Sequence, residues 1–145
     1  MKYFLRQAKT TDYDFLYRLK VTCLKEYVAA IWGWDDDFQR SHFAAHFDPA
    51  ASHIVVVCGR DAGQLSVIDR PEERYLSGIY LLPAYQGQGL GSQIIGDVLA
   101  SARNEDRPVS LQVLVGNPAR RLYERLGFKV VGRTATHTLM RSGLL

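Results

Sequence analysis

Three glycines lie within five positions of the segment YQGQGLGSQ, residues 85–93, directly ahead of a stretch with helical periodicity. Glycine permits backbone angles that other residues avoid, so the amide N–H groups of such a loop can point outward together. The helix that follows adds its unpaired first-turn N–H groups and the positive end of its dipole. The segment therefore predicts a binding site for an anion, and a phosphate group is the expected ligand.

The spacing of these glycines separates the segment from two other phosphate-binding loops. A P-loop requires Gly-Lys followed by Ser or Thr, and a dinucleotide-binding loop requires GxGxxG. Gly87, Gly89 and Gly91 fit neither pattern. A tight turn that only packs a helix closely is the structural alternative, so a second motif is needed to decide between them.

The second motif is the segment NPARRLYERLGF, residues 117–128. Asn117 followed by proline is typical of a helix start, and Gly127 is typical of a helix end. Within this helix the spacing places Tyr123 on the same face as several apolar residues, which directs its phenol toward the core. A buried tyrosine hydroxyl needs a polar partner, which makes Tyr123 a candidate for proton chemistry.

Hydrophobic periodicity predicts the elements that must position these motifs. We expect one α/β domain over residues 1–145, with a mostly antiparallel sheet and one crossover from strand to helix to strand around the glycine loop. The expected strands cover residues 3–9, 53–60, 64–69, 74–82, 109–115, 128–133 and 136–140, with a turn at residues 61–63. The expected helices run from residues 10–12 to 33, from 35–37 to 48, from 90 onward and from 117 to 127.

Both motifs resemble those of the GNAT superfamily of acetyl-CoA-dependent N-acyltransferases. LPAYQGQGLG is similar to the Q/R-x-x-G-x-G/A signature, with Gln86, Gly89 and Gly91 in the signature positions. NPARRLYERLGF resembles the late helix of that family, and the two motifs together span residues 79–128. The resemblance implies a GNAT fold, α/β (α+β), with a mixed and mostly antiparallel sheet of about seven strands and about four helices.

The resemblance also implies acetyl-CoA (coenzyme A) as cosubstrate. The amides of residues 86–91 and the following helix would bind the pyrophosphate, while the fourth strand would pair with the pantetheine arm like an added strand. An amide near Leu81 would stabilise negative charge on the acetyl oxygen. Ser92 would add a hydroxyl contact to the phosphate, although a local helix cap explains this serine equally well. The expected cofactor-binding residues are Tyr80, Leu81, Leu82, Gln86, Gly87, Gln88, Gly89, Leu90, Gly91, Ser92 and Asn117.

For catalysis the resemblance assigns Tyr123 as the general acid that protonates the departing thiol, with an ordinary buried tyrosine as the alternative. Many relatives carry a glutamate on the fourth strand that deprotonates the amine, and Gly78 stands in that place here. Another base, a water relay or a neutral substrate is then required. The candidate bases, none of which is assigned, are Glu26, Asp69, Glu72 and Glu73.

The expected reaction is transfer of an acetyl group to a primary amine by direct attack. A non-catalytic acyl-CoA-binding module and transfer to a hydroxyl group are the alternatives. Residues 32–37, WGWDDD, combine aromatic rings with carboxylates, which suits a cationic amine, although tryptophan packing with acidic helix capping explains them equally. Whether Trp32, Trp34 and Asp35 line the acceptor site stays open.

Composition argues against several other classes of protein. The 18 basic and 15 acidic residues are interspersed and give a net charge of +3, so no nucleic-acid partner is expected. Apolar runs are too short for a membrane span, and no signal peptide is evident. The two cysteines lack CxxC spacing, which predicts a reduced, cytoplasmic chain. We separately expect a monomer or a homodimer. His42 and His46 lack the glutamate of HExxH and a third ligand, so no metal is expected.

Overall fold

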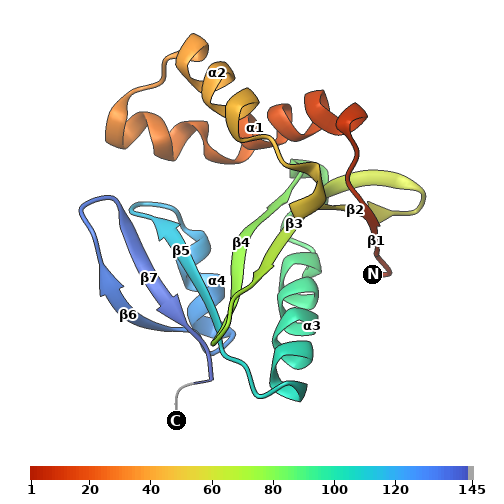
Figure 1. Cartoon of the computed structure of the whole chain (residues 1–145), viewed down its shortest axis with the longest axis vertical. Helices are drawn as coiled ribbons and strands as arrows, with labels where there is room; N and C mark the ends of the chain where they lie inside the picture. Colours follow the sequence, from red (N-terminus) through yellow and green to blue (C-terminus); the bar gives the residue numbers. More distant parts are fainter. Residues whose placement is uncertain (144–145) are drawn as a thin grey trace. The chain divides into compact units, whose positions relative to one another are not determined.

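The computed structural model describes residues 1–143. Within them the elements follow the expected order, and the strands and helices each begin or end within about two residues of the predicted bounds, apart from one hairpin. Figure 1 shows the arrangement. The elements are β1 (Phe4–Gln7), α1 (Tyr13–Trp32), α2 (Asp36–His46), β2 (His53–Val57), β3 (Arg60–Asp69), β4 (Arg74–Leu81), α3 (Leu90–Asn104), β5 (Val109–Leu114), α4 (Ala119–Arg125), β6 (Lys129–Arg133) and β7 (His137–Arg141).

The seven strands form one sheet in the order β1-β2-β3-β4-β5-β7-β6. The pairs β1–β2, β2–β3, β5–β7 and β6–β7 are antiparallel. Strands β4 and β5 are parallel, with Arg74 opposite Val109 and Tyr75 opposite Ser110. Parallel neighbours need a crossover connection, and α3 supplies it. The expected α/β fold with a mixed, mostly antiparallel sheet is confirmed.

Residue contacts divide the chain into two compact units. Unit 1 comprises Met1–Ser66 and Gly78–Gln86, and unit 2 comprises Val67–Ser77 and the residues from Gly87 onward. Strands β3 and β4 contribute residues to both units, so each unit is described by itself.

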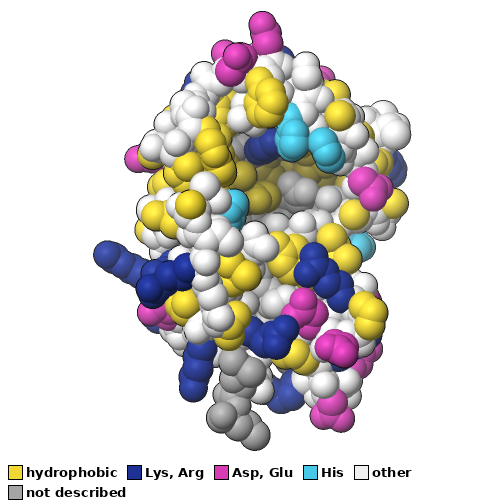
Figure 2. Space-filling model, turned by 60° about the vertical axis from the view of Figure 1, so that its left-hand side comes forward, with side chains coloured by type: hydrophobic (Ala, Val, Ile, Leu, Met, Phe, Trp, Pro, Cys, Tyr) yellow, Lys and Arg dark blue, Asp and Glu magenta, His cyan; other side chains and the backbone are white. Residues whose placement is uncertain are grey.

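In unit 1, α1 and α2 lie side by side along an aromatic seam (Figure 1). Tyr13 packs edge-on against Phe43 and Phe47, with ring centroids 5.1 and 5.0 Å apart, and Tyr17 does the same against Phe43 at 5.3 Å. Such edge-to-face pairs stabilise the contact beyond simple burial, which fixes α2 on α1. On the face drawn in Figure 2, histidine side chains (cyan) lie beside hydrophobic ones (yellow).

In unit 2, α3 buries one face against the sheet. Leu90, Ile94 and Ile95 are fully buried, at the spacing that the sequence pattern requires for one helical stripe. Val109 on β5 and Met140 on β7 are equally inaccessible to solvent. Leu90 therefore anchors the first turn of α3, directly after the glycine loop, in the core.

The predicted hairpin turn at residues 61–63 is wrong. The chain reverses instead at Cys58 and Gly59, which have φ angles of 50° and 75°, as a two-residue turn with positive φ at both positions requires. Gly63 lies inside β3, opposite Val55. It must be glycine for another reason, because a Cβ atom there would lie 2.2 Å from the carbonyl oxygen of Tyr80.

Candidate functional site

The glycine loop adopts the backbone that its sequence predicts at two of its three glycines. Gly87 and Gly89 have φ angles of 72° and 82°, and Gly89 is the N-cap of α3 in the left-handed conformation. A Cβ atom at either position would meet no other atom within 4 Å. The backbone angle, and not crowding, therefore requires glycine there. Gly91 lies inside α3 and has no positive φ.

The first turn of α3 has N–H groups without a partner inside the helix. The first hydrogen bond of α3 runs from the N–H of Gln93 to the carbonyl of Gly89, at 3.0 Å. The N–H groups of Leu90, Gly91 and Ser92 precede this bond. The residues four positions before them lie outside the helix, so these groups have no helical carbonyl to bind. The loop itself is exposed. This arrangement fits an anion such as a pyrophosphate.

The end of β4 is the edge of the sheet within unit 1. The N–H of Leu82 donates to the carbonyl of Ala62 at 2.9 Å, so the main-chain groups of Leu82 point toward β3. Because main-chain groups alternate in direction along a strand, those of Ile79 and Leu81 face the opposite edge. No strand of unit 1 covers that edge. Within unit 1, the N–H of Leu81 on this edge can pair with an extended ligand, whereas the Leu81 carbonyl already accepts two side-chain hydrogen bonds.

The carbonyl of Leu81 is held by two side chains within unit 1. The Gln86 amide donates to it at 2.8 Å, and the thiol of Cys23 on α1 donates at 3.3 Å. Burial raises the pKa of Cys23 despite this hydrogen bond, so the group stays a protonated donor at neutral pH. Sequence analysis missed Cys23, because no local pattern connects residues 58 positions apart.

The position of the absent glutamate is covered by an aromatic ring. A Cβ atom on Gly78 would lie 2.8 Å from Cε2 and 3.1 Å from the hydroxyl oxygen of Tyr80. Residues two apart share one face of a strand, which explains why this ring can lie over Gly78. The space next to Gly78 is therefore already filled.

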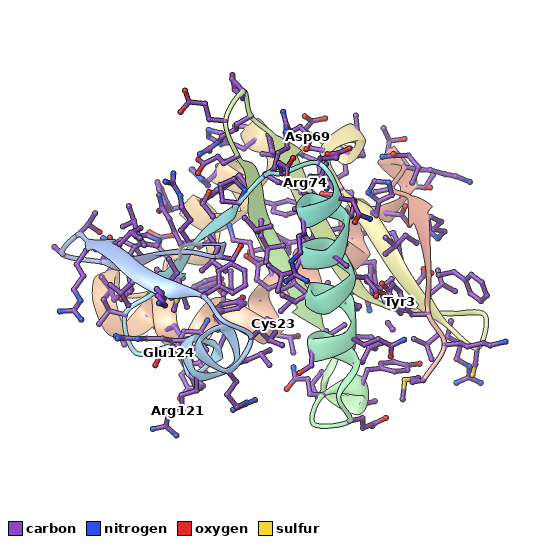
Figure 3. All side chains as sticks on the ribbon, turned by 90° about the horizontal axis from the view of Figure 1, so that it is seen from below. Tyr3, Cys23, Asp69, Arg74, Arg121 and Glu124 are labelled. Carbon is purple, nitrogen blue, oxygen red and sulfur yellow. The ribbon has the colours of Figure 1, made fainter. Side chains whose placement is uncertain are left out.

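Two of the four candidate bases, Asp69 and Glu73, are engaged in ion pairs within unit 2. Asp69 contacts Arg74 at 2.9 Å (Figure 3) and Arg107 at 3.3 Å, and the hydrogen bond from Arg74 lowers the pKa of Asp69. Partial burial is the largest single influence on Glu73 and opposes its ionisation, but the hydrogen bond with Arg141 at 2.8 Å and further contacts, including one with Arg70, together lower its pKa. Stabilised carboxylates are weak bases, so both are poor candidates. The other two, Glu26 and Glu72, are exposed and join none of the ion pairs of residues 1–143.

Tyr123 lies on the buried face of α4, 9% exposed, as its spacing predicts. Its ring packs edge-on against Phe128 with centroids 5.8 Å apart, and burial raises the pKa of its phenol to about 12. Asn117 caps this helix, because its side-chain oxygen accepts from the N–H of Ala119 at 3.0 Å. Arg121 on the same helix is exposed and points away from it (Figure 3).

The segment WGWDDD makes the helix-capping contacts that were predicted as the alternative to a site for a cationic amine. Asp35 accepts from the N–H of Phe38 at 3.0 Å and caps α2. The indole N–H of Trp34 donates to Asp36 at 2.6 Å, while Trp32 is 58% exposed. Elsewhere among the described residues, no group of three or more potential metal ligands occurs, and no helix has the length and apolar character of a membrane span.

A sequence model of the Acetyltransferase (GNAT) family matches residues 13–128, which is most of the chain. The chain belongs to the GNAT acetyltransferase family. The family that this model describes is one of acetyltransferases. The glycine loop, the end of β4 and Tyr123 stay predicted parts of this chain's site, each described within its own unit.

Individual relatives of this GNAT acetyltransferase are distant. It is 36% identical over 61 residues to a [ribosomal protein bS18]-alanine N-acetyltransferase of Haemophilus influenzae, and the match covers 41% of this chain and 42% of that protein. The chain thus matches less than half the length of that relative. Its fold is similar to the PaiA N-acetyltransferase of Thermoplasma acidophilum, solved with coenzyme A, with a TM-score of 0.79 at 15% identity over 99% of this chain and 100% of that one. It is also similar to the ribosomal-protein-S18-alanine N-acetyltransferase of Escherichia coli, with a TM-score of 0.68 at 19% identity over 97% and 93%.

The buried phenol of Tyr123 makes the free energy of unfolding of the GNAT acetyltransferase depend on pH. In the unfolded chain a tyrosine ionises near pH 10, whereas the folded pKa is about 12. The unfolded state therefore loses its proton first as the pH rises, and stability falls between these two values by about 2 to 3 kcal/mol. We expect urea unfolding to show this loss in the wild type and a smaller loss in Tyr123→Phe. Equal alkaline losses in the two proteins would contradict it.

Proposed function

We propose that this GNAT acetyltransferase transfers an acetyl group from acetyl-CoA to a primary amine by direct attack in a ternary complex. The observation that carries the proposal is the loop in which Gly87 and Gly89 hold positive φ angles at the start of α3. An alanine N-acetyltransferase among its relatives supports an amine as the acceptor.

Two sets of main-chain groups would bind different parts of acetyl-CoA, the pyrophosphate and the pantetheine arm. The N–H groups of residues 87–92 would bind the pyrophosphate, helped by the positive end of the α3 dipole. The N–H of Gln86 instead donates to the carbonyl of Pro83 at 3.2 Å. The open edge of Ile79 and Leu81 would pair with the pantetheine arm, flanked by Tyr80 and Leu82. Besides capping α4, Asn117 would form a hydrogen bond with the pantetheine chain. When bound, acetyl-CoA supplies an acetyl group already activated as a thioester.

Leu81 and Tyr123 would carry the chemical step. The N–H of Leu81 faces the open edge, where it can donate to negative charge that develops on the acetyl oxygen. Its neighbouring peptide is fixed by Gln86, Cys23 and Ala62, so little reorganisation is needed. Tyr123 would donate its phenolic proton to the departing sulfur. With Gly78 in place of a glutamate, the amine arrives neutral or loses its proton through water.

A panel of acceptors tests this function by release of the coenzyme A thiol from acetyl-CoA. Polyamines, aminoglycosides, amino acids and peptide N-termini should include at least one acceptor that accelerates thiol release. The same amines, acetylated beforehand at nitrogen, should not. Tight binding of acetyl-CoA without thiol release from any amine would contradict the proposal in favour of a binding module. Turnover confined to hydroxyl acceptors would contradict it too.

A further inference from the structure

Three basic side chains gather on one side of the seam between α1 and α2. His42 and His46 lie one helical turn apart on α2, with ring centroids 4.2 Å apart. The Lys20 ammonium of α1 lies 5.7 Å from the centroid of the Phe43 ring, which belongs to the same seam. Burial, the charge of His46 and the charge of Lys20 all lower the pKa of His42. The three groups are therefore close enough to repel one another when charged.

None of the three has an acidic partner among residues 1–143. The ion pairs of the described chain do not include Lys20, His42 or His46. Two of the three carboxylates at the start of α2 have other partners, since Asp35 caps the helix and Asp36 accepts from Trp34. The third, Asp37, joins none of the ion pairs of the described residues. Another cation at the seam, Arg40, lies over the Tyr17 ring at 5.0 Å. The half-buried Lys20 ammonium thus lies near two imidazoles and has no ion-pair partner among the described residues.

The donor groups of the cluster are directed by contacts within the helices. His46 Nδ1 lies 2.9 Å from the carbonyl of His42, and a carbonyl can only accept, so the proton of this bond is on Nδ1. The other ring nitrogen, Nε2, therefore accepts in the neutral ring and donates to a carboxylate only when the ring is protonated. His42 and His46 are exposed, and Lys20 is half-buried. In Figure 2, cyan histidine side chains adjoin a dark-blue basic side chain on the same face.

The cluster lies close to the proposed site of acetyl transfer within unit 1. Lys20 and Cys23 are three residues apart on α1, so their side chains emerge as neighbours about 5 to 6 Å apart. The Cys23 thiol in turn contacts the carbonyl of Leu81 at 3.3 Å. An acceptor whose amine lies near the main chain of Leu81 can therefore extend over about one helical turn of α1 to reach Lys20.

We propose that Lys20, His42 and His46 bind a carboxylate of the acceptor, so that the substrate is a small amine that also carries a carboxylate. A single negative charge compensates Lys20 and accepts hydrogen bonds from the imidazoles. It relieves the repulsion within the cluster, which no side chain of the described chain does. This inference rests on the proposed function, since it names the class of acceptor for the same reaction.

Matched acceptors test the site by kinetics. Glycine, β-alanine, γ-aminobutyrate and ε-aminocaproate are each compared with their amides, which keep the amine and remove the charge. We expect at least one acid to exceed its amide in kcat/KM, and Lys20→Met to lower that ratio about 10- to 100-fold. Lys20→Arg should restore much of it. Lys25→Met is the control, because Lys25 lies on the same helix over Trp34, and it should leave the ratio unchanged.

Nuclear magnetic resonance of the imidazoles tests the site without catalysis. Bound carboxylate favours the protonated ring, so the acids should raise the pKa of His42 and His46 and the amides should not. His42→Gln and His46→Gln assign the signals. Absence of thiol release together with raised imidazole pKa values would overturn the proposed reaction and support the anion site. Equal effects of acids and amides in both measurements would overturn the anion site and leave the acetyltransferase function standing.

Discussion

Gly89→Glu is expected to weaken binding of coenzyme A by about 100-fold or more. Gly89 holds a φ of 82° as the N-cap of α3, which costs another residue about 1 to 2 kcal/mol. The added carboxylate would also face the pyrophosphate that the loop is proposed to bind. At a separation of about 5 Å and an effective dielectric constant of about 20, that repulsion is about 3 kcal/mol for each phosphate charge. Isothermal titration calorimetry with coenzyme A measures the loss.

Gly89→Asn is the matched control for this prediction. Asparagine tolerates left-handed backbone and carries no charge, so it should bind coenzyme A within about 10-fold of the wild type. A thermal melt of each variant shows whether the fold is kept, since Leu90 next to the substitution is buried in the core. Wild-type affinity in a folded Gly89→Glu protein would show that the loop does not bind the diphosphate.

Tyr123→Phe is expected to lower kcat about 100-fold or more while leaving the affinity for coenzyme A within about twofold. A general acid contributes at least this much when its proton is transferred in the slow step. The phenylalanine ring keeps the edge-on contact with Phe128, so the packing of α4 is retained. Steady-state thiol release with the best acceptor of the panel gives kcat, and calorimetry gives the affinity.

Tyr85→Phe is the control for the loss of a tyrosine hydroxyl near the glycine loop. Tyr85 is half-buried just before the loop and has no assigned role, so its variant should keep kcat. If Tyr123→Phe is as active as the wild type, the acid assignment fails and another group protonates the thiol. A low kcat accompanied by an equal loss of coenzyme A affinity would point to a structural role instead.

The sequence predicted the parts of this molecule that depend on local backbone chemistry. Gly87 and Gly89 adopt positive φ angles, Asn117 caps α4, and Tyr123 is buried, each as expected. These features follow from the residue type and its immediate neighbours, which a single sequence displays. The order of strands and helices followed from periodicity for the same reason.

Features that depend on contacts between distant residues were not predictable. The need for glycine at Gly63 comes from the carbonyl of Tyr80 on a neighbouring strand, so the residue looked like part of a turn. The hydrogen bond from Cys23 to Leu81 joins a helix to a strand far along the chain. The sequence placed His42 and His46 one turn apart but could not place Lys20 beside them, because that contact depends on how α1 packs against α2.

The ring of Tyr80 over Gly78 makes these two positions a coupled pair for enzyme engineering. A glutamate introduced at Gly78 alone would push its Cβ atom to within 2.8 Å of the ring, so the ring must rotate away or the strand must distort. Trimming Tyr80 alone opens the space without supplying a base. A glutamate at Gly78 alone therefore has to displace the ring, whereas a simultaneous replacement of Tyr80 by a smaller residue removes that clash.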